Sequence, residues 1–384
     1  MELTQGQISE IISNYTSSSE GFVTLQSLIM NSLMAHEREL FVKANKNEQC
    51  NGFRPHRWYC KGYTFVLRIP RSRSGNFYPV LLGIIRSECE ERAALVYQLY
   101  TKGLTTEQIS EVIETVYGRA YSKQQISYLA NSCREDVEAW LNRRLSAHYL
   151  AIYIDATFIA TRRDQQVSKE AYYTILGVLE DGSREVLTIV NYPTEGALCW
   201  KEVLNSLKER GVEQIDLVVS DALQGIENAV CSAFPQTAHQ FCVAHVKRQT
   251  LNSVSHKDKP IVNQELNEVF TLENKERKSL QGYEHFITFV NRWEKKYPVL
   301  RKYKAQRNIA YFTYMDFPIE VQRCIYTTNW IERLNRKYKR TIKMRAAMPS
   351  SQSVLFLLAS VAMEETKTTY RRKVYQWRCW KESK

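Results

Sequence analysis

The sequence lacks any apolar run long enough to span a membrane; the longest, residues 354–359, has the length of a stretch within a buried helix. Its beginning lacks the basic-then-apolar pattern of an export signal, so we expect the chain to stay in the cytoplasm. It also lacks a disulfide framework, because its 9 cysteines are odd in number and scattered, as expected of reduced thiols. These absences argue against membrane-spanning and disulfide-rich secreted proteins.

What the sequence does have is enough apolar material for a folded core and an uneven excess of positive charge. Its 384 residues are 44% hydrophobic and 11% aromatic, which predicts two or three folded domains. The net charge is +12, and between residues 333 and 384 there are 14 Lys and Arg against 3 Glu. A block of one sign indicates a polyanionic partner.

Aromatic residues are interleaved with this basic block. Such residues stack on the sugars or bases of a nucleic acid, but packing in the protein core is an equal alternative for each of them. They are Tyr338, Tyr370, Tyr375, Trp377 and Trp380.

Two acidic residues stand in or beside apolar stretches typical of buried strands. Asp155 interrupts the apolar run 150–158, which has no alternating polar residues and is typical of a central strand covered on both faces. Asp221 follows a second such run, 214–220, 66 residues further along. A hydrogen-bonded structural aspartate would explain either one alone. Two acids at the ends of neighbouring strands repel each other, and a divalent cation is the usual reason to place them together.

A two-metal site usually draws a further carboxylate from outside the strand pair. The candidate is Glu332, 111 residues after the second acid, in a stretch that Thr327 or Thr328 can cap as a helix. Arg336 and Arg340 follow at i+4 and i+8, which places a carboxylate beside cations on one helix face. The alternative is an ordinary surface ion pair between Glu332 and Arg336.

The beginning of the chain is the least informative part. Apolar residues at helical spacing predict a helical arm in residues 1–62. An alternating stretch, a basic turn and a second apolar stretch predict a β-hairpin in residues 63–86. Cys50, His56 and Cys60 match no closed four-ligand pattern, so a zinc site is the less favoured interpretation.

Three helix starts follow in residues 87–148. Ser87, Thr105 and Ser122 are each followed three residues later by Glu or Gln, which is the pattern of a capping box. Three short helices in succession favour a helix-turn-helix whose third helix enters a DNA groove, and the alternative is an ordinary helical linker. The candidate DNA-contacting residues of the third helix are Lys123, Gln124, Gln125, Ser127 and Asn131.

Residues 149–245 predict three meandering strands and then strand–helix alternation. This order indicates an α/β fold with a mixed sheet and helices on both faces. Residues 246–323 are charged, aromatic and strand-poor, and predict an all-helical insertion before residues 324–365 return to the sheet domain. Residues 366–384 are expected to be a basic C-terminal tail. The predicted strands are 150–159, 171–180, 185–191, 214–220 and 237–243, and the predicted helices between them are 194–210 and 223–233.

Four motifs, in this order and across the inserted region, resemble bacterial insertion-sequence transposases of the Mutator-like superfamily, over about residues 67–358. The resemblance implies a DDE-type, RNase H-like mixed sheet with an all-helical insertion, preceded by a helical helix-turn-helix DNA-binding region. It implies that Asp155, Asp221 and Glu332 are the catalytic triad and the metal ligands. Cys242 and His245 would be the accompanying Cys-x-x-His signature. The motifs are Ile154-Asp155-Ala156, Ser220-Asp221-Ala222 with Gly225, Cys242-x-x-His245, and Thr328-Asn329-x-Ile331-Glu332 with Asn335.

The implied activity is that of a DNA transposase, which binds the terminal inverted repeats of its insertion sequence and performs Mg²⁺-dependent strand cleavage and strand transfer with two ions. Oxygen ligands favour Mg²⁺ or Mn²⁺ over zinc. Cys242 and His245 are interpreted as a structural pair beside the active site, with zinc ligation or a catalytic pair as alternatives. The cations expected to hold DNA phosphates near the third acid are Arg333, Arg336, Lys337, Arg340, Lys343 and Arg345.

The expected partners are double-stranded DNA, as transposon ends and target, and a second copy of the chain, because two DNA ends must meet. No membrane partner is expected, and the expected location is the bacterial cytoplasm, in association with the nucleoid. Two alternatives stay open: a non-catalytic helix-turn-helix DNA-binding protein derived from a transposase, and an RNase H-like nuclease that cleaves without joining.

Overall fold

The computed structural model describes residues 4–45, 47–60, 63–117, 121–163, 166–192, 197–223, 225–272 and 278–383. The chain forms two compact units, Met1–Cys133 and Arg134–Lys384. In the described part of the chain, no helix combines the length and the apolar character needed to cross a membrane.

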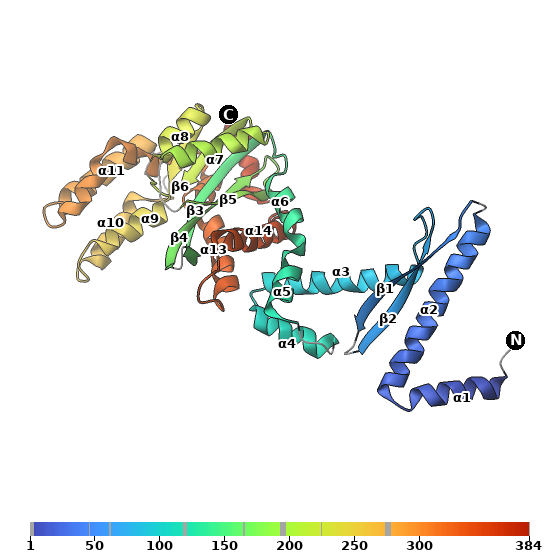
Figure 1. The fold of residues 1–384 in the computed structure, drawn as a ribbon. Helices are drawn as coiled ribbons and strands as arrows, with labels where there is room; N and C mark the ends of the chain where they lie inside the picture. The colour runs from blue at the N-terminus through green and yellow to red at the C-terminus, as the bar shows by residue number, and fades with distance from the viewer. Residues whose placement is uncertain are drawn as a thin grey trace. The chain divides into compact units, whose positions relative to one another are not determined.

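The first unit consists of helices and one two-stranded antiparallel ribbon (Figure 1). Alternate residues of the second strand, including Phe65 and Leu67, are buried against Met34 of the long second helix. The elements are α1 (Gln5–Thr16), α2 (Ser19–Ala44), β1 (Cys50–Cys60), β2 (Tyr63–Ser72), α3 (Val80–Thr101), α4 (Thr106–Tyr117), α5 (Lys123–Ala130) and the 3-10 turn η1 (Asn131–Cys133).

The β-hairpin predicted for residues 63–86 is wrong, because its second strand does not form. Strand β2 forms where the alternating stretch predicted it, but its partner β1 precedes it, so the helical arm predicted for residues 1–62 ends at Ala44. Strand β1 has little apolar alternation and contains Pro55, which a two-stranded ribbon tolerates because it has edges only. The second apolar stretch instead begins α3, with Pro79 at the N-cap.

The zinc interpretation of Cys50, His56 and Cys60 is also excluded, because all three lie along β1. A strand rises about 3.3 Å per residue, so the first and last of them are about 33 Å apart. They cannot meet around one ion.

Helices α3, α4 and α5 share a small apolar core. The capping boxes predicted at Thr105 and Ser122 are confirmed by reciprocal hydrogen bonds with Gln108 and Gln125. Ser87, in contrast, lies inside α3 and starts no helix. The fully buried members of this core are Val96, Ile109, Ile113 and Ile126, with Ala130 almost fully buried.

The second unit is built on a five-stranded mixed sheet with the strand order β5-β4-β3-β6-β7. Strands β3, β4 and β5 are antiparallel neighbours, whereas β6 runs parallel to β3 and β7 runs parallel to β6. The predicted mixed α/β sheet is therefore confirmed. Its strands are β3 (His148–Arg163), β4 (Gln166–Val178), β5 (Arg184–Asn191), β6 (Gln214–Ser220) and β7 (Ala238–Phe241).

Helices cover both faces of this sheet (Figure 1). On central strand β3, Ile152 and Ile154 belong to the apolar cluster formed with α7 and α8, and the alternate residues Tyr153 and Asp155 contact the chain around α12 and α13. Alternation along a strand explains this division. The helices are α6 (Arg134–Leu141), α7 (Ala197–Glu209), α8 (Ile226–Ala233), α9 (Val243–Asn252), α10 (Lys259–Val269), α11 (Ser279–Trp293), α12 (Ile319–Ile325), α13 (Asn329–Ile342) and α14 (Ser351–Lys367).

In its described residues, the inserted region between the sheet and α12 consists of helices joined by turns and contains no strand, as predicted. Its aromatic side chains form a core of their own, in which Phe270 stacks on Phe312 with ring centroids 4.8 Å apart and Phe286 lies beside both. Besides α10 and α11, the region contains the 3-10 turns η2 (Pro298–Lys304), η3 (Gln306–Tyr311) and η4 (Thr313–Asp316).

The end of the chain packs on the sheet domain instead of forming a free basic tail. Val374 N–H donates to Gly182 O at the β4–β5 turn, and Trp380 Nε1 donates to Asp216 Oδ2 at 3.0 Å. Core packing is therefore the correct alternative for four of the five aromatic residues considered for stacking. The fifth, Tyr375, is 70% exposed, and the Arg378 guanidinium carbon lies 4.4 Å from its ring centroid. The four buried ones are Tyr338, Tyr370, Trp377 and Trp380.

Candidate active site

Asp155 lies in the middle of β3, where it is 8% exposed. Its Oδ2 accepts a hydrogen bond from Asn335 Nδ2 of α13 at 2.9 Å. Burial raises the pKa of Asp155 to about 6; nearby His245 opposes this rise, and the carboxylates of Asp221 and Glu332 add to it. Asp221 and Glu332 are thus close enough to Asp155 to influence the ionisation of its carboxyl group.

Asp221 follows directly on β6, and its loop is fixed by short hydrogen bonds. Ser220 Oγ donates to Asp221 O at 2.8 Å and lies 2.8 Å from His239 Nε2, while Leu223 N–H donates to the same Asp221 O. The Asp221 carboxylate oxygen Oδ1 lies 3.5 Å from His245 Nδ1. This acid is partly exposed, unlike the buried one on β3.

Glu332 lies in the first turn of α13, with its side chain 30% exposed. Its Oε1 lies 3.7 Å from Arg248 Nη2 of α9. Among the described residues, no ion pair joins Glu332 to Arg336. The alternative of an ordinary surface ion pair between these two residues is therefore wrong, because the partner of Glu332 is Arg248. Thr328 is the N-cap residue of α13, as expected, although its side chain caps no helical N–H.

Cys242 and His245 lie at the start of α9, between the second and third acids. The Cys242 sulfur accepts hydrogen bonds from Thr328 N–H at 3.4 Å and from Thr328 Oγ1 at 3.3 Å, and Cys242 N–H donates to Ser220 O at 2.8 Å. Cys242 therefore ties the end of β6 to the start of α13, that is, the elements carrying Asp221 and Glu332.

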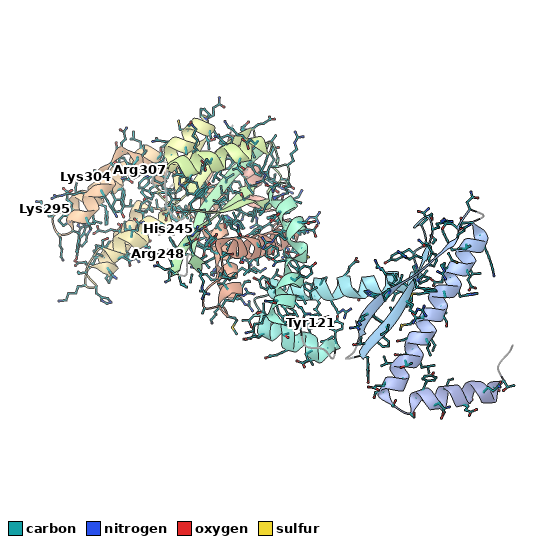
Figure 2. The ribbon with its side chains drawn as sticks, viewed as in Figure 1. Tyr121, His245, Arg248, Lys295, Lys304 and Arg307 are labelled. Atoms are coloured by element: carbon teal, nitrogen blue, oxygen red, sulfur yellow. The ribbon has the colours of Figure 1, made fainter. Side chains whose placement is uncertain are left out.

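His245 supplies positive charge to the site. A hydrogen bond to Cys242 raises its pKa to about 9, and the negative charges of Asp221 and Asp155 contribute to the rise against the effect of burial. Arg248 lies three residues further along the same helix (Figure 2). Helix α9 therefore presents one cation to Asp221 and another to Glu332.

The donor set has the chemistry of a site for Mg²⁺ or Mn²⁺, because its three carboxylates supply oxygen ligands. Within the residues described, no three His, Cys, Asp or Glu side chains are clustered as ligands of one ion. The acids are therefore electrostatic neighbours that have not converged into a closed ligand set.

Four of the five residues predicted to read DNA lie on the exposed side of α5, and Asn131 follows as its C-cap residue. Two of the four have other partners. Lys123 forms an ion pair with Glu107, and Gln125 Oε1 accepts the Ser122 N–H as part of the capping box. Gln124 and Ser127 are exposed. Tyr128, 78% exposed beside them, was not predicted.

The C-terminal cations separate into two groups. Lys343 is exposed, and Arg345 Nη1 donates to Thr341 O at 3.2 Å. The other four predicted phosphate contacts line one pocket beside α13, and they are Arg333, Arg336, Lys337 and Arg340.

Two polar neighbours of the acids received no role from the sequence, although Asn335 stands in one of the four motifs, and each had a local signal. Asn335 follows Glu332 by three residues and Arg248 follows His245 by three, so each pair shares a helix face. Arg184 of the same pocket had no such signal, because it reaches α13 only through the tertiary fold.

Comparisons with known proteins agree with the sequence resemblance. The family described as "Transposase, Mutator family" matches residues 2–371. The chain is 31% identical over 344 residues to the transposase for insertion sequence element IS905 of Lactococcus lactis, covering 87% of this chain and 86% of the relative. It is 34% identical over 312 residues to the transposase for ISRM3 of Rhizobium meliloti, covering 80% and 76%.

More distant relatives have similar coverage. The transposase for IS256 in transposon Tn4001 of Staphylococcus aureus is 24% identical over 348 residues, covering 88% of this chain and 87% of the relative. A solved structure, the Drosophila P element transposase strand transfer complex, aligns with a TM-score of 0.32 and 7% identity over 76% of this chain and 83% of that chain. A similarity at that level carries no argument about this protein.

Proposed function

The chain belongs to the Mutator family of transposases, and on that premise we propose that Asp155, Asp221 and Glu332 are the catalytic acids with which it cleaves and joins DNA. The observation that carries the proposal is the shared set of contacts around the three acids. Two side chains of α9 reach two of them, His245 at 3.5 Å from Asp221 and Arg248 at 3.7 Å from Glu332, and Asn335, on the helix of Glu332, donates to Asp155 at 2.9 Å. A structural aspartate gains nothing from two further carboxylates nearby, whereas a cation-binding site requires them.

Asp155, Asp221 and Glu332 would hold two Mg²⁺ or Mn²⁺ ions. Such ions, when bound, lower the pKa of water and stabilise the entering and leaving oxygens of a displacement at phosphorus. The same chemistry serves hydrolysis of one strand and attack by a 3′-hydroxyl, so one site would perform cleavage and strand transfer.

The other residues of the site would position and balance the acids. The Asn335 amide holds one Asp155 oxygen in place and orients the carboxylate. His245 and Arg248 offset the mutual repulsion of Asp221 and Glu332 while no metal is bound. Cys242 fixes the distance between β6 and α13 through Thr328 and Ser220, which supports a structural role for the Cys-x-x-His pair.

The strand order favours an RNase H-like interpretation of this sheet. Three antiparallel strands lead into two parallel ones, the first acid lies on the first strand, and the second follows the first parallel strand. The third acid arrives on a helix after the helical insertion, which corresponds to the arrangement that the family resemblance implied.

The α3–α5 core is proposed as a helix-turn-helix that reads transposon ends. Its third helix, α5, buries Ile126 and exposes Gln124, Ser127 and Tyr128, which leaves polar groups free for a major groove. Because Lys123 and Gln125 already have partners within the unit, we expect Gln124 and Ser127 to contribute more to base recognition than those two.

Two copies of the chain are proposed to act together, because transposition joins two ends of one element to a target. The DNA ligands would be the terminal inverted repeats on either side of the coding sequence, and then a target duplex.

The test compares Asp155→Asn with a matched control, Glu213→Gln, on duplexes that carry the DNA ends flanking the coding sequence. Glu213 is exposed, immediately before β6 and at the opposite end of that strand from Asp221. Both variants lose one carboxylate. Asp155→Asn should abolish nicking in Mg²⁺ and keep its DNA affinity, and the control should keep both.

Two further arms complete this test. Nicking should stop when EDTA removes the metal, and a pre-nicked end should give strand-transfer products with the wild type, which a nuclease that only cleaves would not form. Mg²⁺-dependent cleavage retained by Asp155→Asn would refute the triad.

A further inference from the structure

A basic pocket of about 600 Å³ lies between α13, the start of β5 and the end of α14. It is open to solvent and combines guanidinium groups with two aromatic rings. The residues that form it are Arg184, Trp330, Arg333, Leu334, Arg336, Lys337, Arg340, Glu365, Thr369 and Tyr370.

The charges that line the pocket are unbalanced. Five side chains are cationic and one, Glu365, is acidic, and that carboxylate is already bound by Lys337. In the described part of the chain, the remaining four cations form no ion pair with a carboxylate. Positive charge concentrated in a concave surface attracts anions more strongly than the same charge spread over a flat one.

Arg184 is the unusual member, because it is a buried cation with incomplete partners. It is 8% exposed, and its guanidinium carbon lies 4.3 Å from the Trp330 ring centroid and 5.0 Å from that of Tyr370. Nη2 donates to Arg372 O at 3.4 Å, whereas Nε is buried and has no hydrogen-bond partner among the described residues. Burying such a group is costly unless an anion or an acceptor meets it.

The pocket adjoins the acids along α13, but none of the three acids lines it. Successive residues of a helix are about 100° apart, so Arg336, Arg340 and Arg333 lie about 40°, 80° and 100° round α13 from Glu332. Asn335, which donates to Asp155, lies about 60° from Glu332 in the other sense. Glu332 therefore stands between the cations of the pocket and the residue of α13 that contacts Asp155.

We propose that this pocket binds a phosphate group, with Arg184 as the buried anchor and Arg333 and Arg340 as its exposed contacts. A planar guanidinium fork matches two phosphate oxygens, and the flanking rings hold Arg184 in one orientation. The pocket is larger than one orthophosphate, so it has room for a phosphate with its attached sugar. Two sources share this chemistry: the backbone of duplex DNA, which rests on the proposed function, and a free phosphorylated small molecule, which does not.

The first experiment measures thermal unfolding of the full chain in inorganic phosphate and in chloride at equal ionic strength. Phosphate should raise the melting temperature of the wild type by about 2–4 °C more than chloride. The shift should be lost in Arg184→Gln and in the double variant Arg333→Gln/Arg340→Gln. It should persist in Arg323→Gln/Lys295→Gln, which removes two exposed cations outside the pocket.

The second experiment identifies the source by fluorescence anisotropy of a labelled duplex over a range of salt concentrations. If the pocket holds backbone phosphates, Arg333→Gln/Arg340→Gln should lower the slope of log affinity against log salt by about 2, and the control double variant should not. Inorganic phosphate should then compete with the duplex better than chloride does. If the source is a small molecule, the melting shift remains pocket-dependent while the duplex slope stays unchanged.

A wild type that responds equally to phosphate and chloride would overturn the proposal, and so would a full phosphate shift in Arg333→Gln/Arg340→Gln. That double variant changes exposed side chains, so it decides the matter even if Arg184→Gln fails to fold. Asp155→Asn should keep the phosphate shift. Loss of its nicking therefore tests the catalytic assignment separately from the pocket.

Discussion

Asp155 and Asp221 come from neighbouring parallel strands, yet the fold holds them in different ways. Asp155 lies inside β3, where burial and one amide donor fix it and raise its pKa to about 6. Asp221 lies just beyond β6 and is held by its loop and by His245. The comparison indicates that β3 supplies a buried acid with a raised pKa, and that β6 supplies a more exposed one beside a cation.

The largest effect is expected on the β3 side. Asn335→Ala should lower the nicking rate about 10- to 100-fold, because a hydrogen bond to a carboxylate contributes roughly 1.5–3 kcal/mol and its loss leaves Asp155 without that donor. Affinity for duplex DNA should not change. Lys339→Ala, an exposed position of the same helix, is the control. Equal nicking by the two variants would show that the amide does not position Asp155.

An effect of intermediate size is expected on the pH dependence of stability. It comes from His239, whose Nε2 lies 2.8 Å from Ser220 Oγ at the end of β6. Burial lowers the pKa of His239 to about 4 from an ordinary value near 6.5, so the unfolded chain binds more protons between these values and stability falls as the pH drops through this window. Between pH 7.5 and 5.0 the wild type should lose about 2 kcal/mol more free energy of unfolding than His239→Asn.

Urea unfolding at both pH values, in EDTA, measures this difference. Asp155 changes stability with pH in the opposite sense, because its raised pKa makes its ionisation destabilising. Subtracting the pH dependence of His239→Asn from that of the wild type removes this contribution. Identical pH dependence in the two proteins would mean that His239 is not buried as a neutral group beside Ser220.

The smallest effect is expected at Cys242, which links the end of β6 to the start of α13. Cys242→Ala should lower the free energy of unfolding by about 1 kcal/mol, because Thr328 N–H and O–H lose their acceptor. Cys242→Ser keeps an acceptor of similar size and should lose less. Chemical denaturation compares them, and an equal loss would show that the sulfur only fills space.

Sequence patterns were most informative where the chain is buried on both sides. The long apolar runs of β3 and β6 identified the central strands and their acids, because runs without alternating polar residues are typical of strands covered on both faces. Strand β1 left no such signal, since a two-stranded ribbon buries little and even admits Pro55. This difference explains why the sheet was predicted well and the hairpin was not.

The surroundings of the acids were only partly predictable. Local spacing within one helix places Asn335 beside Glu332, but nothing in the spacing shows that its amide reaches Asp155, 180 residues earlier. The same holds for Arg184, which meets α13 through tertiary packing alone. The sequence also left open whether the aromatic residues of the basic block are buried or exposed. Composition does not show which segments pack against the sheet domain.

The measurement that tests the account most directly is nicking by the three single variants Asp155→Asn, Asp221→Asn and Glu332→Gln and by the triple variant, in Mg²⁺ on one duplex. If the acids hold shared ions, each single variant should lose nearly as much activity as the triple, because groups that act as a unit are strongly non-additive. Losses that multiply from single to triple variant, or one single variant that cleaves normally, would contradict a common site.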